Sequence, residues 1–222
     1  MLKLAVVIGL IVTSIVCARY ALADFYYQNA KDHYGFLSAS QSITVKHIKP
    51  IMADIDDALK LRASHTDALD FKADLLYQLW WLSPDGQYLH QSDHLQKALK
   101  LHLRSNDYRI NWAYSAARVA LIYSHQPNLD EKFEYWFAKS HRLGLYETAI
   151  ARSLGELGLQ HWPFLTDDQR KLTKDYIRVS IEQKANSPMS MALLLSRYKK
   201  HKSICFELPS SVRKDQMCAI SL

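Results

Sequence analysis

Apolar residues recur every three or four positions through most of the chain, which is the spacing of one face of an α-helix. The segments with this spacing are Ile48 to Arg62, Leu69 to Trp80, Leu95 to Leu103, Tyr108 to Tyr123, Asp130 to Arg142, Tyr146 to Leu159, Asp167 to Lys184 and Met189 to Lys199. Residues typical of turns separate them, at Ser83–Gly86, Gln126–Asn128, Gly144, Trp162–Pro163 and Asn186–Pro188. The pattern predicts an all-α fold of consecutive helices, and the capping-box spacing of Thr166 and Gln169 predicts where one of them begins.

The N-terminus carries a different pattern, an uninterrupted apolar run from Leu4 to Ala18 between Lys3 and Arg19. As a helix these fifteen residues span about 22 Å, which is short of the roughly 30 Å hydrocarbon core of a bilayer. Residues 20–23 extend the run if Arg19 directs its charge toward the headgroups. Residues 1–23 are therefore predicted to be a membrane anchor or a signal peptide.

Two interpretations of this segment stay open. The Ala21-Leu22-Ala23 sequence matches a signal-peptidase site, which would leave a soluble periplasmic protein. The helical pattern continues past Ala23, with Phe25 and Tyr26 where an interfacial aromatic belt would lie, so we favour a retained anchor. This second interpretation gives a single pass through the inner membrane with the bulk of the chain in the periplasm.

The exported part divides into residues 24–200, a predicted helical-hairpin array, and a C-terminal tail of residues 201–222. Cys17 lies in the apolar run, which leaves Cys205 and Cys218 as an even pair. In an oxidising compartment these two are candidates for a disulfide that closes the tail, and the alternative is two free thiols. Two cysteines are too few to complete a zinc site.

A repeated sequence motif supports the predicted helical-hairpin array. Ala58-Leu59-Lys60-Leu61 recurs as Ala98-Leu99-Lys100-Leu101, and the same offset of 40 relates Asp67 to Asp107. A second step of 40 leads from Ala98 to Ala138. The motif resembles the junction between consecutive tetratricopeptide repeats, although its period differs and the proline usual at the turn before each new repeat is missing. We therefore expect stacked helical hairpins of tetratricopeptide-like type with an irregular period near 40.

The short anchor, the Ala23-Asp24-Phe25-Tyr26-Tyr27 junction, the Ala58/Asp67/Ala73 unit and the chain length together resemble the VpsP-like polysaccharide biosynthesis accessory proteins. The resemblance implies a role in making or exporting an exopolysaccharide or an O-antigen-type chain. It implies, as partners, the other proteins of such an assembly or export system, with glycan as a further candidate. No catalytic motif contributes to the resemblance.

The net charge of +6 does not indicate a nucleic-acid partner. Without Lys3 and Arg19, which flank the apolar run, 26 Lys and Arg residues stand against 22 Asp and Glu, a surplus of four. These basic residues are spread along the chain, whereas a nucleic-acid footprint is a dense stripe. The predicted export also argues against binding to nucleic acid.

Catalytic and cofactor motifs are missing from the sequence. G-x-S-x-G, G-x-x-x-x-G-K-[ST] and G-x-G-x-x-G do not occur, and Gly155 and Gly158 are better explained by close helix packing. His90 and His94 have a helical metal-ligand spacing, but the HExxH glutamate is missing, so we predict no metal and no cofactor. If the protein is instead a periplasmic carbohydrate-active enzyme, a lyase or a hydrolase, Glu156 has the most apolar sequence surroundings.

Aromatic residues give the remaining functional signal. Trp80 continues the apolar stripe of its helix and is predicted to be core, so its neighbour Trp81 must face elsewhere. Trp81, Trp112 and Trp136 are the candidate binding residues, for a partner protein or for sugar rings. The sequence thus predicts a membrane-associated accessory or scaffold protein that binds without turnover, with the carbohydrate-active enzyme as the alternative.

Overall fold

The computed structural model describes residues 2–40, 43–83, 92–126, 128–183, 188–199 and 204. Over these residues the chain forms nine α-helices, one short 3-10 helix and no strand, which confirms the predicted all-α fold. The elements are α1 (Leu2–Ser40), α2 (Val45–Leu61), α3 (Thr66–Leu82), α4 (Asp93–Tyr108), α5 (Ala113–Tyr123), α6 (Glu131–Gly144), α7 (Thr148–Gln160), η1 (Trp162–Phe164), α8 (Asp167–Glu182) and α9 (Pro188–Arg197). They form two compact units, one up to Ile110 and one from Asn111 onward.

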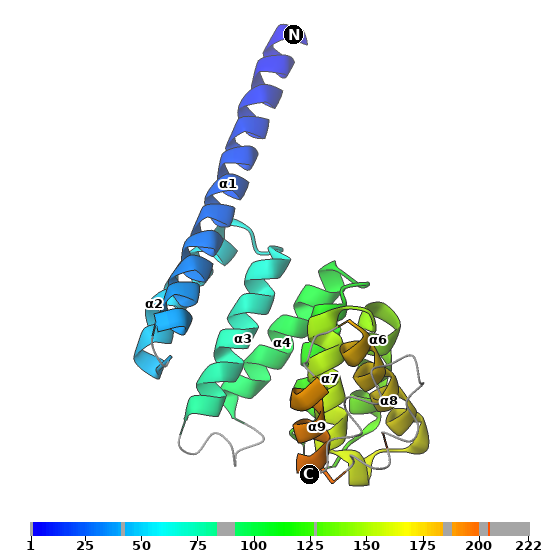
Figure 1. Cartoon of the computed structure of the whole chain (residues 1–222). Helices are drawn as coiled ribbons and strands as arrows, with labels where there is room; N and C mark the ends of the chain where they lie inside the picture. Colours follow the sequence, from blue (N-terminus) through cyan, green and yellow to red (C-terminus); the bar gives the residue numbers. More distant parts are fainter. Residues whose placement is uncertain are drawn as a thin grey trace. The chain divides into compact units, whose positions relative to one another are not determined.

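In the first unit, α1 and α2 pack as one antiparallel pair and α3 and α4 as the next, with α2 against α3 (Figure 1). The C-terminal half of α1 is held in this unit by one buried face. Ala23, Ala30 and Leu37 are spaced by seven residues and are almost completely buried. Small side chains at two of these positions let the helix backbones approach closely. On the same half of α1, the Asn29 amide donates to Asp54 Oδ2 of α2 at 2.9 Å.

The N-terminal half of α1 has no such partners and extends beyond α2 (Figure 1). Its large apolar side chains, from Leu4 at 66% to Val16 at 42%, are exposed. The hydroxyls of Thr13 and Ser14 donate to the carbonyls of Gly9 and Leu10, each at 2.9 Å, so neither presents an unsatisfied polar group. Within the described part of the chain, α1 is the helix long and apolar enough to cross a membrane.

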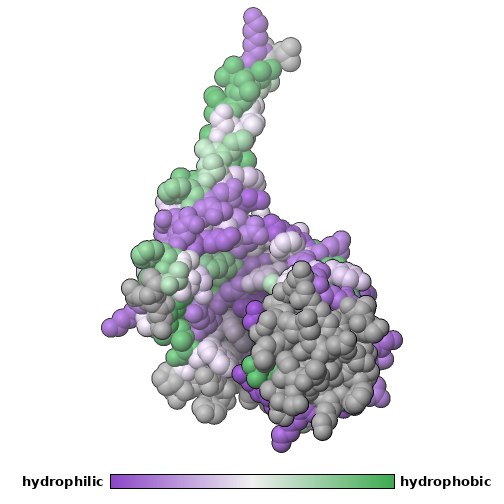
Figure 2. Space-filling model, in the orientation of Figure 1, coloured by the Kyte–Doolittle hydropathy of each residue, from purple (hydrophilic) through white to green (hydrophobic). Residues whose placement is uncertain are grey.

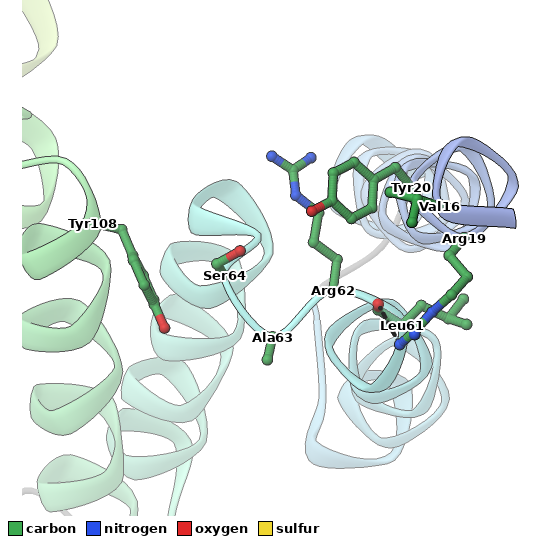
Figure 3. A pocket seen from close by; sticks show the side chains of 8 residues that line it. All are labelled: Val16, Arg19, Tyr20, Leu61, Arg62, Ala63, Ser64 and Tyr108. Atoms are coloured by element: carbon green, nitrogen blue, oxygen red, sulfur yellow. Dashed lines mark hydrogen bonds between the residues drawn. The ribbon is translucent and has the colours of Figure 1, made fainter. Parts of the chain in front are cut away.

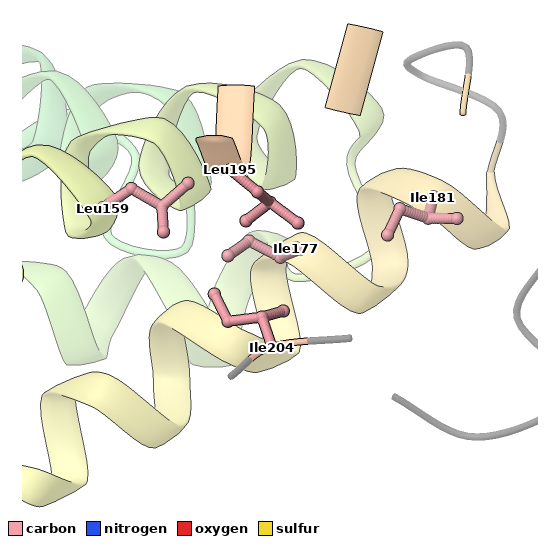
Figure 4. Packing of buried hydrophobic residues seen from close by; sticks show 5 residues of the cluster. All are labelled: Leu159, Ile177, Ile181, Leu195 and Ile204. Carbon is pink, nitrogen blue, oxygen red and sulfur yellow. The ribbon is translucent and has the colours of Figure 1, made fainter. Parts of the chain in front are cut away.

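The second unit is built from the hairpins α5/α6 and α7/α8, which pack on each other. Its core contains Phe133 and Phe137 of α6, whose stacked rings lie 5.3 Å apart, and Tyr176 of α8 at 5.5 Å from Phe137. Against α7 and α8 lies a further apolar cluster that includes α9. Figure 4 shows this cluster, which consists of Leu159, Ile177, Ile181, Leu195 and Ile204.

The predicted role of glycine in close helix packing is confirmed at Gly158, whereas Gly155 has room for a small side chain. A Cβ atom on Gly158 would lie 2.2 Å from Thr173 Oγ1, so α7 and α8 approach too closely there for any side chain. A Cβ on Gly155 would make contacts no shorter than 3.4 Å, to Ile177. The capping box at the start of α8 is also present, with Thr166 accepting from the Gln169 backbone and the Gln169 side chain accepting from Thr166 N.

Two sequence-based details need correction. The segment predicted to begin near Tyr108 begins at Ala113, because α4 continues to Tyr108 and a turn follows. The offset of 40 relates successive hairpins but not equivalent helix positions: Ala58 lies in the last turn of α2, whereas Ala98 lies in the second turn of α4. Ala58 and Ala98 are both fully buried, as close helix packing requires. The predicted disulfide between Cys205 and Cys218 lies outside the described residues.

Candidate functional site

A pocket of about 410 Å³ opens where α1 meets the turn between α2 and α3 (Figure 3). All of its lining residues belong to the first unit. They are Val16, Arg19, Tyr20, Leu61, Arg62, Ala63, Ser64 and Tyr108. The apolar half of α1 ends at this level, and the molecular surface changes there from hydrophobic to hydrophilic (Figure 2). The pocket therefore lies at the base of the exposed apolar half of α1.

Arg62 is the central charged group of the pocket. It follows the last residue of α2, and its guanidinium lies 4.8 Å from the centre of the Tyr20 ring, an arrangement that allows a cation–π interaction. Its Nη1 lies 3.7 Å from Asp24 Oδ1 on α1. Its Nε is buried and has no hydrogen-bond partner among the described residues. The Arg62 side chain as a whole is 34% exposed and so brings a positive charge to the pocket.

Two further arginines bind backbone carbonyls around the same turn. Arg19 of α1 donates to the carbonyl of Leu61 at 3.2 Å, and Arg104 of α4 donates to the carbonyl of Ala63 at 2.9 Å. Arg104 also lies 5.9 Å from the ring centre of Tyr108. These contacts fix the turn and gather three guanidinium groups around it.

His65 joins the same turn to α1. Its Nε2 lies 2.8 Å from Asp24 Oδ1, its Nδ1 accepts from the Ala68 N–H, and its ring lies 5.0 Å from the ring of Tyr27. Burial lowers the pKa of His65 and outweighs the opposing effect of Asp24, so the ring is neutral at pH 7. Among the described residues, Asp24 is then the acidic side chain in contact with Arg62. Three arginines surround the same turn, so the surroundings of the pocket are positive.

A second polar cluster lies inside the first unit, between α3 and α4. His102 is completely buried, and its Nδ1 lies 2.9 Å from Asp70 Oδ1 while its Nε2 lies 3.5 Å from Asp74 Oδ1. The Ser105 hydroxyl donates to the other oxygen of Asp70 at 2.9 Å. Burial acts to lower the pKa of His102, but the hydrogen bonds to Asp70 and Asp74 outweigh it and raise that pKa.

These residue types are those of a hydrolytic triad, but their arrangement is different. The serine hydroxyl binds the carboxylate, whereas a nucleophilic serine must bind the histidine that accepts its proton. Ser105 and His102 are both completely buried, so a substrate has no access to either. The cluster joins α3 to α4 and supplies no nucleophile.

The structure places the predicted aromatic residues in separate surroundings. Trp80 is buried as predicted, and Trp81 is 50% exposed at the end of α3 in the first unit. Trp112 and Trp136 lie in the second unit, at the start of α5 and on α6. Trp112 is partly exposed, whereas Lys139 Nζ lies 4.7 Å from the ring centre of Trp136 and covers one of its faces. Trp81 is the candidate with the largest exposed surface.

The remaining sequence candidates add no catalytic geometry. Glu156 is half-buried on α7, between Gly155 and Gly158. Among the described residues, no group of three or more His, Cys, Asp or Glu side chains is arranged to hold a metal ion. His94 is exposed near the start of α4, and His90 lies outside the described residues.

Sequence reasoning missed the pocket because its residues are distant along the chain. Arg19, Arg62 and Arg104 come from α1, the α2–α3 turn and α4. Their nearly constant spacing, 43 and then 42 positions, is the one signal in the sequence that could have grouped them. That spacing exceeds the repeat offset of 40, so the repeat alone does not align them.

Comparison of the chain with protein-family models, curated proteins and solved structures found no match. The function is therefore inferred from the geometry of these sites.

Proposed function

We propose that the protein is a membrane-anchored binding scaffold, held against the bilayer surface by α1 and acting through contacts with other proteins or with glycan. The observation that carries this proposal is the division of α1. One continuous helix exposes apolar side chains over its first half and buries Ala23, Ala30 and Leu37 in the first unit over its second half. A helix of this kind fixes a folded unit directly at the membrane surface.

The contacts of α1 favour a retained anchor over a cleaved signal peptide. Cleavage after Ala23 would remove Arg19 and Tyr20, which bind the carbonyl of Leu61 and the guanidinium of Arg62. It would also make Asp24 the N-terminal residue, at a position that lies in the middle of α1. Lys3 before the apolar run favours an orientation with the N-terminus in the cytoplasm and the helical units in the periplasm.

The process that this scaffold serves is proposed from the resemblance to VpsP-like accessory proteins. It is the biosynthesis or export of a surface polysaccharide, of exopolysaccharide or O-antigen type, and the partners are the other proteins of that system. Trp81 supports a binding role because exposed tryptophans are enriched at the energetic centres of interfaces.

Two variants compared in the native host test the proposal. Trp81→Ala removes an exposed side chain, so we expect normal protein abundance and normal melting temperature with reduced polymer output. Glu156→Gln is nearly isosteric and removes any general acid at that position, so we expect unchanged polymer output. Loss of polymer in Glu156→Gln at normal abundance and melting temperature would instead identify the protein as a carbohydrate-active enzyme.

A further inference from the structure

We propose that the pocket at the base of α1 binds the phosphate headgroup of an anionic membrane lipid, in the leaflet that faces the helical units. The proposal rests on membrane insertion of α1, as proposed above, and goes beyond it by assigning a ligand. It depends on three properties of the pocket, namely its depth in the bilayer, its charge and its mixed lining.

The first property is depth. Lys3 and Arg19 bound the apolar run and are separated by about 24 Å along a helix, which is less than the roughly 30 Å of bilayer hydrocarbon. With Lys3 at one boundary of the hydrocarbon core, Arg19 and Tyr20 do not extend beyond the headgroup layer on the opposite side. Both residues line the pocket, so the pocket opens among the headgroups. Tyrosine at such a boundary is typical of an interfacial belt.

The second property is charge. Arg62, whose side chain is 34% exposed, and Arg19 both line the pocket. Arg104 adds a third guanidinium at the same turn through its bond to Ala63. Asp24 offsets only one of these charges. Guanidinium groups present paired N–H donors that match phosphate oxygens, so an anionic phosphate is the ligand chemistry that fits.

The third property is the mixed lining, which distinguishes a lipid from a free phosphate ion. Ser64 and Tyr108 add hydroxyl donors, whereas Val16 and Leu61 add apolar side chains (Figure 3). A volume of about 410 Å³ lies in the range of roughly 300–1,000 Å³ typical of small-molecule sites. A bare phosphate would leave much of this space and the apolar lining unused, whereas a glycerophosphate headgroup with the start of its acyl chains uses both.

The test is a titration of the full chain, purified in an uncharged detergent, with short-chain lipids followed by native mass spectrometry. The probes are dihexanoylphosphatidylglycerol, dihexanoylphosphatidylcholine and inorganic phosphate. We expect the phosphatidylglycerol to bind about tenfold more tightly than either of the others, because a net anion and an apolar portion are both required. Equal binding of the two lipids would overturn the proposal, and inorganic phosphate binding as tightly as phosphatidylglycerol would reassign the pocket to a soluble anion.

Charge variants connect the binding to the pocket. Arg62→Gln removes the central guanidinium and should weaken phosphatidylglycerol binding about tenfold, the loss expected for a charged hydrogen-bonding group. Arg19→Gln, at an exposed position, serves as a second variant if Arg62→Gln lowers the melting temperature. The matched control is Lys46→Gln, an equal charge loss at the far end of α2, about 24 Å away along the helix axis.

An equal effect of Lys46→Gln and the arginine variants would show diffuse charge attraction and reject the pocket. Extraction of the full chain from phosphatidylcholine vesicles by alkaline carbonate tests the anchor separately. A chain that is extracted contradicts the proposed function, whereas a chain that stays inserted but does not distinguish the two lipids contradicts only this inference.

Discussion

At the scale of single residues, His102 and Asp70 bring charge into the interior of the first unit. Asp70 accepts from both His102 and Ser105, so each oxygen of its carboxylate is bound. Removing one partner of such a buried pair leaves the other charge uncompensated, which typically costs about 3–5 kcal/mol. The pair therefore makes the stability of the α3–α4 hairpin dependent on the protonation of one ring.

The sign of this dependence follows from the raised pKa of His102. The stabilising contribution of the charged ring is fully present below the ordinary pKa of 6.5 and is lost as the pH rises through the higher folded-state value. Burial lowers the pKa of His65, His141 and His161, so their protonation destabilises the fold only below pH 6.5. We therefore expect amide exchange in α3 and α4 to report a stability that falls above pH 6.5, by at most about 1.4 kcal/mol per pH unit.

His102→Gln is the control for this prediction, since it keeps a donor for Asp70 and removes the titration. Its exchange profile should be flat over the range in which the wild-type stability falls. Parallel profiles for the two proteins would show that another group is responsible.

Single residues also show what the sequence could and could not reveal. The contrast between buried Trp80 and exposed Trp81 was predictable, because adjacent helix residues point about 100° apart and only one can follow the apolar stripe. The role of Arg62 was not predictable. Its partners Tyr20 and Asp24 are about 40 positions away, and no local pattern relates them.

At the scale of elements, α7 and α8 show how two glycines of one short sequence differ in their surroundings. Gly158 faces Thr173, whose Oγ1 is held by the carbonyl of Gln169 at 2.8 Å and cannot move away freely. Gly155 faces Ile177 at ordinary contact distance. The two positions lie on one helix face but leave different amounts of space.

Alanine substitutions should therefore change stability in opposite directions. Gly158→Ala creates overlap with Thr173, and overpacking costs about 1–3 kcal/mol, which exceeds the roughly 1 kcal/mol gained in helix propensity. Gly155→Ala keeps most of that gain because its contacts remain ordinary. Thermal unfolding of the full chain in detergent should show a lower midpoint for Gly158→Ala and an equal or higher one for Gly155→Ala. A higher midpoint for Gly158→Ala would mean that the two helices separate at little cost.

The sequence predicted most helices because turn residues stand at the positions where the apolar periodicity stops. It failed at the boundary between α4 and α5, where no glycine or proline marks the turn. Tyr108 and Ile110 there continue an apolar spacing although both are exposed, at 52% and 66%. Arg109 explains the turn, since its guanidinium binds both oxygens of Asp67 on α3, at 2.9 and 3.1 Å. A contact over this sequence distance has no local signature.

At the scale of the whole molecule, the proposed orientation of α1 in a membrane can be measured. Alkaline phosphatase fused after Leu222 should be active, because the phosphatase folds only in an oxidising compartment and the orientation proposed for α1 puts the C-terminus there. Green fluorescent protein fused at the same point should be dark when exported in unfolded form. Stable full-length fusions with an inactive phosphatase and a fluorescent reporter would place the units in the cytoplasm.

With α1 inserted as proposed, its continuity makes the orientation of the first unit depend on bilayer thickness. No described residue breaks the helix between its exposed half and the half packed on α2, so the two halves share one axis. A membrane helix adjusts to the thickness of its bilayer by tilting. Any such tilt must rotate the first unit by the same angle, because the same continuous helix forms part of that unit. Under the proposed insertion, the lipid composition around α1 would therefore set the angle at which this unit faces the membrane.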